Sequence, residues 1–121
     1  GLEKKICLGD LSAEIDWGYA REYMEIAWKT LQQPAPDDYI IATGETHSVR
    51  EWLDEAFKLV GLDANKYYEI NPKFMRPTKT GRLVGDISKL RKTFGFEPKV
   101  KFRELVRIMV ESDLKLITRK C

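Results

Sequence analysis

Two features of this chain have the chemistry needed to hold an anion. Residues 43–50, TGETHSVR, join a β-type run to the start of a predicted helix. Backbone N–H groups at a helix N-terminus, together with the helix dipole, favour negative charge. Arg76 precedes Pro77, so its backbone is biased toward an extended conformation that can aim the guanidinium at phosphate oxygens. Both features also have ordinary interpretations, a simple helix cap for the first and a solvated turn for the second.

Other kinds of site need residues that the sequence lacks. His47 is the only histidine, and it lies directly before a predicted helix cap, which argues against a Ser–His–Asp triad. The sequence contains no C-x-x-C pair and no cluster of metal-ligand residues. None of the eight glycines forms a G-x-G-x-x-G or P-loop pattern, and no tyrosine is followed four residues later by a lysine. We therefore expect no metal site, no catalytic residue and no cofactor site within these residues.

The composition indicates an ordered globular unit. The 121 residues fit one domain, and 43% of them are hydrophobic, which is enough for a core. The net charge of +2, with both signs mixed along the chain, does not indicate a nucleic-acid partner. Hydrophobic runs are too short to span a membrane, and no signal peptide is visible. Since two cysteines are too few for a disulfide framework, we expect a reducing, cytoplasmic location.

The first half of the chain predicts a helix, a strand and a second helix. Asp16 is expected to cap a helix that runs to about Gln33, with an inward face at helical spacing formed by Ala20, Tyr23, Met24, Ala27, Trp28 and Leu31. Residues 39–43, YIIAT, then predict a short buried strand. Ser48 and Glu51 form an S-x-x-E capping box for the next helix, and Gly61 is suited to end it.

The second half predicts shorter elements and a final helix. Residues 66–71, KYYEIN, favour a strand, and residues 82–84 favour a short extended piece. Asp86 is expected to cap a helix over 87–94, which Gly95 ends. The last helix is expected over 102–117, with its inward face formed by Phe102, Leu105, Val106, Met109, Val110 and Ile117. We therefore expect a single α/β unit over residues 1–121, with more helix than strand.

The order of these blocks resembles one enzyme family. Residues 8–52 contain DWGYAREY and IATGETHSVREW, and residues 76–114 contain RPTKTGRLVGD followed by GFEP. These blocks are similar to the motifs L-G-N-L-D-x-x-R-D-W-G, A-T-G-x-x-x-S-V-R-E, R-P-x-E-V-D-x-L-x-G-D and G-W-x-P. Those motifs are typical of GDP-mannose 4,6-dehydratases, which are extended short-chain dehydrogenases/reductases. The resemblance covers nearly the whole chain.

The resemblance implies a fold, a reaction and a site. It implies a small, helix-rich α/β lobe with short strands that binds the nucleotide sugar, while a Rossmann domain outside these residues binds NADP and carries the Tyr-x-x-x-Lys pair. Such enzymes form homo-oligomers and convert GDP-mannose to GDP-4-dehydro-6-deoxy-mannose, a step of GDP-fucose biosynthesis. By this resemblance Arg76 contacts the diphosphate, Ser48, Val49 and Arg50 lie beside the nucleotide, and Lys79 occupies the position that contacts the ribose.

The chain also departs from the family motifs at four positions, and in that family the residues at two of them, 15 and 79, typically contact the nucleotide. Ile15 replaces the arginine of R-D-W-G, and Lys79 and Gly81 replace the two acidic residues after the Arg-Pro pair. Phe96 replaces the closing tryptophan. A lysine cannot accept hydrogen bonds from a ribose diol. The exact base and sugar therefore stay open, as do two alternatives: the lobe of a related epimerase or reductase, and a non-catalytic interaction domain that retains the fold.

Overall fold

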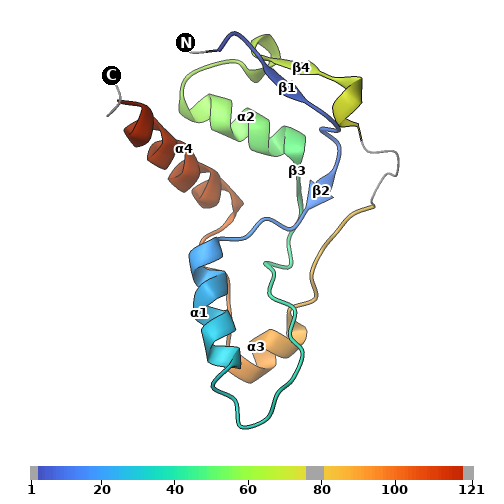
Figure 1. Cartoon of the computed structure of the whole chain (residues 1–121), viewed down its shortest axis with the longest axis vertical. Coiled ribbons are helices and arrows are strands. Elements are labelled where there is room, and N and C mark those ends of the chain that lie inside the picture. Colours follow the sequence, from blue (N-terminus) through green and yellow to red (C-terminus); the bar gives the residue numbers. More distant parts are fainter. Residues whose placement is uncertain (1–2, 76–80, 119–121) are drawn as a thin grey trace.

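Helices form most of the regular structure in the computed structural model, which describes residues 3–75 and 81–118. Figure 1 shows an elongated molecule in which α2, α4 and all the strands lie in the upper part, whereas α1 and α3 lie side by side in the lower part. The expected helix-rich α/β unit with short strands is confirmed.

The upper part is held together by α2 (Val49–Leu59) and α4 (Phe102–Thr118), which pack against each other. Leu53 of α2 and Leu105 and Val106 of α4 are buried, as their helical spacing predicts. After α2, Gly61 has a φ of +71°, the left-handed conformation that lets a helix end there. No helix in the described parts of the chain is long and apolar enough to cross a membrane.

Two pairs of short strands accompany these helices. β1 (Ile6–Leu8) runs parallel to β4 (Tyr68–Ile70), and β2 (Glu14–Ile15) runs antiparallel to β3 (His47–Ser48). The strand predicted within residues 66–71 is confirmed, whereas β1, β2 and β3 were not predicted. Single 3₁₀ turns, η1 (Ala64–Lys66) and η2 (Pro72–Phe74), lie before and after β4.

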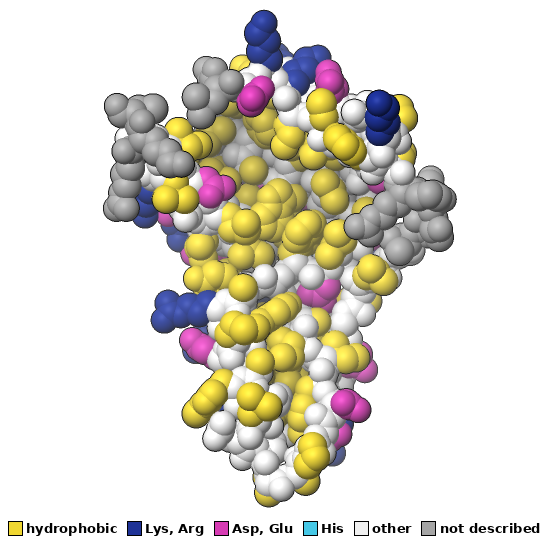
Figure 2. Space-filling model, in the orientation of Figure 1, with side chains coloured by type: hydrophobic (Ala, Val, Ile, Leu, Met, Phe, Trp, Pro, Cys, Tyr) yellow, Lys and Arg dark blue, Asp and Glu magenta, His cyan; other side chains and the backbone are white. Residues whose placement is uncertain are grey.

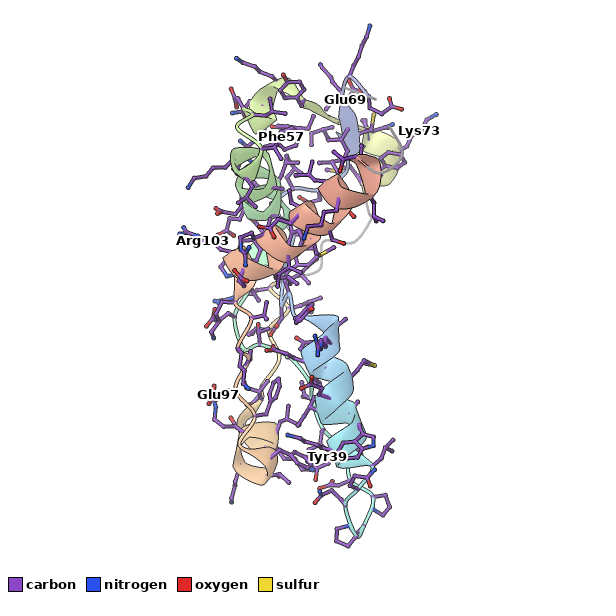
Figure 3. The ribbon with its side chains drawn as sticks, turned by 90° about the vertical axis from the view of Figure 1, so that its left-hand side faces the viewer. Tyr39, Phe57, Glu69, Lys73, Glu97 and Arg103 are labelled. Atoms are coloured by element: carbon purple, nitrogen blue, oxygen red, sulfur yellow. The ribbon has the colours of Figure 1, made fainter. Side chains whose placement is uncertain are left out.

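The lower part contains α1 (Ala20–Thr30) and α3 (Ser88–Phe94). Its core includes Ile26, Ile87 and Leu90, all of them buried, and Gly95 ends α3 with a φ of +62°. Tyr39, labelled at the lower end of Figure 3, packs edge-on against Phe94 with ring centroids 5.2 Å apart. Glu22 links α1 to the segment before α4, because Oε1 accepts hydrogen bonds from the N–H groups of Lys99 and Val100.

Two expectations for the first half of the chain are wrong. Asp16 does not cap α1, whose N-cap is Tyr19 and which ends at Thr30 rather than near Gln33. Residues 39–43 form no strand, although Ala42 is buried. A strand needs a neighbouring backbone for its ladder, and no described segment supplies one to these residues.

The expected inward faces of α1 and α4 are wrong in part. Met24, Trp28 and Leu31 are 65%, 62% and 81% exposed, and on α4 Met109 and Ile117 are also exposed. The spacing correctly marks an apolar face on each helix, but no described element covers these positions. Figure 2 shows hydrophobic side chains spread over the displayed face from the upper part to the lower end.

We expect the 121-residue chain by itself to be marginally stable and to self-associate. Large exposed apolar surfaces and unpaired backbone favour association. Analytical ultracentrifugation should show oligomers at micromolar concentrations, and Trp28→Gln should shift the distribution toward monomer. Lys58→Gln, at an exposed position of α2, is the matched control and should leave the distribution unchanged. A monomeric, two-state unfolding transition well above about 65 °C would contradict this expectation, because mesophile domains cluster at about 45–65 °C.

Candidate functional site

Three segments that are distant in sequence meet around β2. On one side Glu14 pairs with Ser48 and Ile15 with His47; on the other side Ile15 forms a parallel bridge with Leu83. The N–H of Leu83 donates to the carbonyl of Glu14 at 3.3 Å, which confirms the extended piece expected over 82–84. The structure thus brings the blocks 8–16, 41–50 and 81–86 together.

Side chains also join these three segments at the edge of β2. The guanidinium of Arg82 donates from Nε to Thr46 Oγ1 at 2.7 Å, and the same Nε lies 3.4 Å from Glu14 Oε2. Because Arg82 and Glu14 are both well exposed, this pair contributes little to stability. The pair affects position rather than stability, because it keeps Arg82 beside the turn that precedes β3.

Ser48 caps α2 with the predicted capping box. Its Oγ accepts a hydrogen bond from the N–H of Glu51 at 3.1 Å, and Glu51 Oε2 accepts one from the N–H of Ser48 at 2.6 Å. The N–H of Ser48, helped by the hydrogen bond to the His47 ring, lowers the pKa of Glu51. The carboxylate therefore stays ionised at the N-terminus of α2, where the helix dipole favours it.

The backbone donors expected to hold an anion at this turn are already in use. The N–H of Val49 donates to the carbonyl of Ala13 at 3.1 Å, and that of Arg50 donates to the carbonyl of Leu11 at 2.9 Å. The N–H of Glu51 is taken by the Ser48 hydroxyl. These three N–H groups therefore bind the protein itself, so a ligand here would have to be held by side chains.

Arg50 connects α2 to the segment that leads into β4. Its guanidinium donates to Asp54 Oδ2 at 2.8 Å, to the Tyr68 hydroxyl at 2.9 Å and to Asn65 Oδ1 at 2.7 Å. The hydrogen bond with Asp54 is the main reason that the pKa of Arg50 is raised. In this structure all three guanidinium nitrogens serve contacts within the lobe, and a contact with a nucleotide stays a prediction.

The other two expected substrate contacts, Arg76 and Lys79, lie outside the described residues. Their roles stay predictions from the resemblance.

Asp16 is the residue of this region whose role was missed from the sequence. Its Oδ1 accepts hydrogen bonds from the N–H of Thr43 at 2.7 Å and from the Thr43 hydroxyl at 2.5 Å. Its Oδ2 accepts from the N–H of Gly44 at 2.9 Å and of Gly85 at 3.2 Å. A cleft of about 310 Å³ lies beside it and includes Ile15, Tyr23 and Leu83. The only sequence signal for this role was an acidic residue four positions before the helix, which equally suggests a cap.

A second hollow, of about 390 Å³, lies between the N-terminal ends of α2 and α4. His47 stacks on Phe102 at its wall, with ring centroids 3.9 Å apart. The two basic side chains that line this hollow pair with carboxylates: Lys101 Nζ is 3.1 Å from Glu45 Oε1, and Arg103 Nε is 3.8 Å from Glu55 Oε2. Figure 3 shows Arg103 at the start of α4. In the described parts of the chain, no three His, Cys, Asp or Glu side chains lie where they could hold a metal ion.

Comparison with protein families gives one match over most of the chain. The family model described as GDP-mannose 4,6 dehydratase matches residues 1–109. GDP-mannose 4,6 dehydratase 1 of Arabidopsis thaliana is 46% identical over 120 residues, which are 99% of this chain and 33% of that protein. GDP-mannose 4,6 dehydratase of Homo sapiens is 36% identical over 127 aligned residues, which cover 91% of this chain and 34% of that protein. The chain spans about a third of the length of these relatives.

Solved structures share the fold over a similar part of their length. A putative epimerase from Burkholderia cenocepacia is 25% identical with a TM-score of 0.80, covering 90% of this chain and 36% of that one. The dTDP-glucose 4,6-dehydratase of Bacillus anthracis, solved with NAD, has a TM-score of 0.80 at 19% identity and covers 93% of this chain and 35% of that one. At 19% identity, the similarity to the Bacillus anthracis enzyme shows a shared fold alone.

Proposed function

The chain belongs to the GDP-mannose 4,6-dehydratase family, and from this we propose that it is the C-terminal, substrate-binding part of an enzyme that converts GDP-mannose to GDP-4-dehydro-6-deoxy-mannose. The observation that carries the proposal is the match of the family model to residues 1–109. The fold is consistent with it, because Ile15, His47 and Leu83, which belong to the three blocks that resemble the family's motifs, meet around β2.

The role proposed for these residues is to hold and orient the nucleotide sugar. Arg76 is proposed to bind the diphosphate, because a guanidinium presents two parallel N–H donors to phosphate oxygens. Lys79 is proposed to lie near the ribose, where it can donate but cannot accept hydrogen bonds. Ser48, Val49 and Arg50 are proposed to border the nucleotide.

The chain's own residues do not fit NADP, the cofactor proposed for the whole enzyme. Its glycines form no dinucleotide fingerprint, and it has no Tyr-x-x-x-Lys pair. We therefore assign cofactor binding and the hydride chemistry to a Rossmann domain that these residues do not include. The whole enzyme is further proposed to be a cytoplasmic homo-oligomer that supplies GDP-fucose biosynthesis.

Product analysis on a full-length protein that carries residues 1–121 tests the proposed function. The protein is incubated with GDP-mannose and NADP, and the sugar nucleotides are separated and examined by mass spectrometry. A product lacking one water and bearing a ketone is expected. A product of unchanged mass would instead indicate an epimerase, and failure to bind any GDP-sugar would indicate a non-catalytic domain.

We expect the 121-residue chain alone to be inactive in the same assay. It lacks the dinucleotide fingerprint and the tyrosine–lysine pair, so it cannot carry out the redox steps. The measurement is formation of the keto sugar, with the full-length protein as positive control and buffer as background. Turnover above background by the chain alone would contradict this assignment.

A further inference from the structure

Arg82 presents the open edge of its guanidinium beside the turn that precedes β3. Its Nε donates to Thr46 Oγ1 at 2.7 Å and lies 3.4 Å from Glu14 Oε2. Within the described parts of the chain, neither Nη1 nor Nη2 donates a hydrogen bond, and the side chain is 65% exposed. The protein therefore holds one edge of the guanidinium, while the N–H donors of the outer edge remain available to a ligand.

The other donors along this turn already have partners. The backbone N–H groups of residues 49–51 bind the protein itself. All three guanidinium nitrogens of Arg50 donate to side chains of the lobe. The ammonium of Lys101 pairs with Glu45 at 3.1 Å. Among the described cationic side chains along this turn, Arg82 is therefore the one that offers two adjacent donors to a phosphate.

Arg82 also lies next to residues that are proposed to border the nucleotide. Glu14, its neighbour, pairs with Ser48 across β2 and β3, and Thr46 lies two residues before Ser48. We propose that Arg82 binds the diphosphate of the nucleotide sugar through Nη1 and Nη2, while Thr46 holds Nε and orients the guanidinium in advance. Because Glu14 is itself 48% exposed, solvent screens its repulsion of a phosphate. This inference rests on the proposed function.

The test measures the binding of GDP and of guanosine to full-length wild type, Arg82→Ala and Arg82→Lys. Loss of a charge-assisted hydrogen bond at this exposed position should raise the Kd for GDP about tenfold in Arg82→Ala. Arg82→Lys should recover only part of the loss, because an ammonium cannot match two phosphate oxygens at once. Guanosine carries no phosphate, so its Kd should stay near the wild-type value. Calorimetry gives the Kd for GDP, and competition with GDP gives that for guanosine.

The comparison of the two ligands separates a phosphate contact from a structural role. If Arg82 only held the turn in place, its loss would weaken the binding of guanosine as much as that of GDP. Arg103→Ala, which removes an arginine side chain that is 81% exposed at the start of α4, is the matched control and should leave both affinities unchanged. Since the exposed Arg82 pair adds little to stability, Arg82→Ala should keep the wild-type Tm.

The outcomes also distinguish this assignment from the proposed function. If Arg82→Ala folds poorly, Arg82→Lys decides, because its Kd for GDP should still exceed the wild-type value. Wild-type affinity for GDP in the Arg82 variants, or equal losses for GDP and guanosine, would overturn the role of Arg82 and leave the proposed function standing. Absence of GDP binding by the wild type would overturn the proposed function and this assignment with it.

Discussion

Gly85→Ala is expected to destabilise the protein strongly, whereas Gly81→Ala, four residues earlier, is not. The added Cβ at residue 85 would lie 2.3 Å from the Cβ of Ala42 and 3.2 Å from Cγ2 of Ile40. Neither atom is the end of a long flexible side chain, so the backbones must separate. Overpacking of this kind typically costs about 1–3 kcal/mol, and separation would also stretch the bond from Gly85 to Asp16.

Urea or thermal unfolding of the two variants and the wild type measures the difference. Gly81→Ala is the matched control because a Cβ at residue 81 meets no atom of the described residues within 4 Å. Its stability should equal or slightly exceed that of the wild type, since alanine reduces the entropy of the unfolded chain. Equal stabilities for the two variants would show that the close approach of residues 42 and 85 is absent in solution.

Arg76→Ala is expected to weaken GDP binding by the full-length enzyme about 10- to 150-fold, because loss of a charge-assisted hydrogen bond costs roughly 1.5–3 kcal/mol. Binding of NADP should remain nearly unchanged. Arg76→Lys should recover only part of the loss, since an ammonium cannot match two phosphate oxygens at once.

Calorimetric titration of GDP into the Arg76 variants distinguishes a ligand contact from a role in the turn before Pro77. A role in the turn would lower the Tm and leave the affinity for GDP unchanged. Arg103→Ala is the matched control, because the Arg103 side chain is 81% exposed and pairs only loosely with Glu55. Equal affinities of wild type and Arg76→Ala would remove Arg76 from the proposed site.

Local signals in the sequence were sufficient to predict where several helices begin or end. The start of α2 was predicted because Ser48 and Glu51 satisfy each other's backbone donors within one turn. The ends of α2 and α3 were predicted because only glycine readily adopts the positive φ of residues 61 and 95. The extent of α4 followed from the periodicity of its apolar residues.

Other features depended on which segments of the chain pack against each other in the tertiary structure. Residues 39–42 have the composition of a strand, but a strand forms only where a second backbone completes its ladder. Met24, Trp28 and Leu31 have the spacing of a core face, but burial also requires an element that covers them. Periodicity identifies an apolar face without identifying its partner.

The sequence by itself determined the family, the helix-rich composition of the lobe and the helix ends that depend on contacts within a few residues. Only the tertiary structure decided the role of Asp16. A carboxylate near a helix start can cap that helix or accept from distant N–H groups, and both choices satisfy its oxygens. The tertiary structure places the N–H groups of Thr43, Gly44 and Gly85 within 3.2 Å of this carboxylate, so the side chain connects residues 43–44 to residue 85 and does not cap α1.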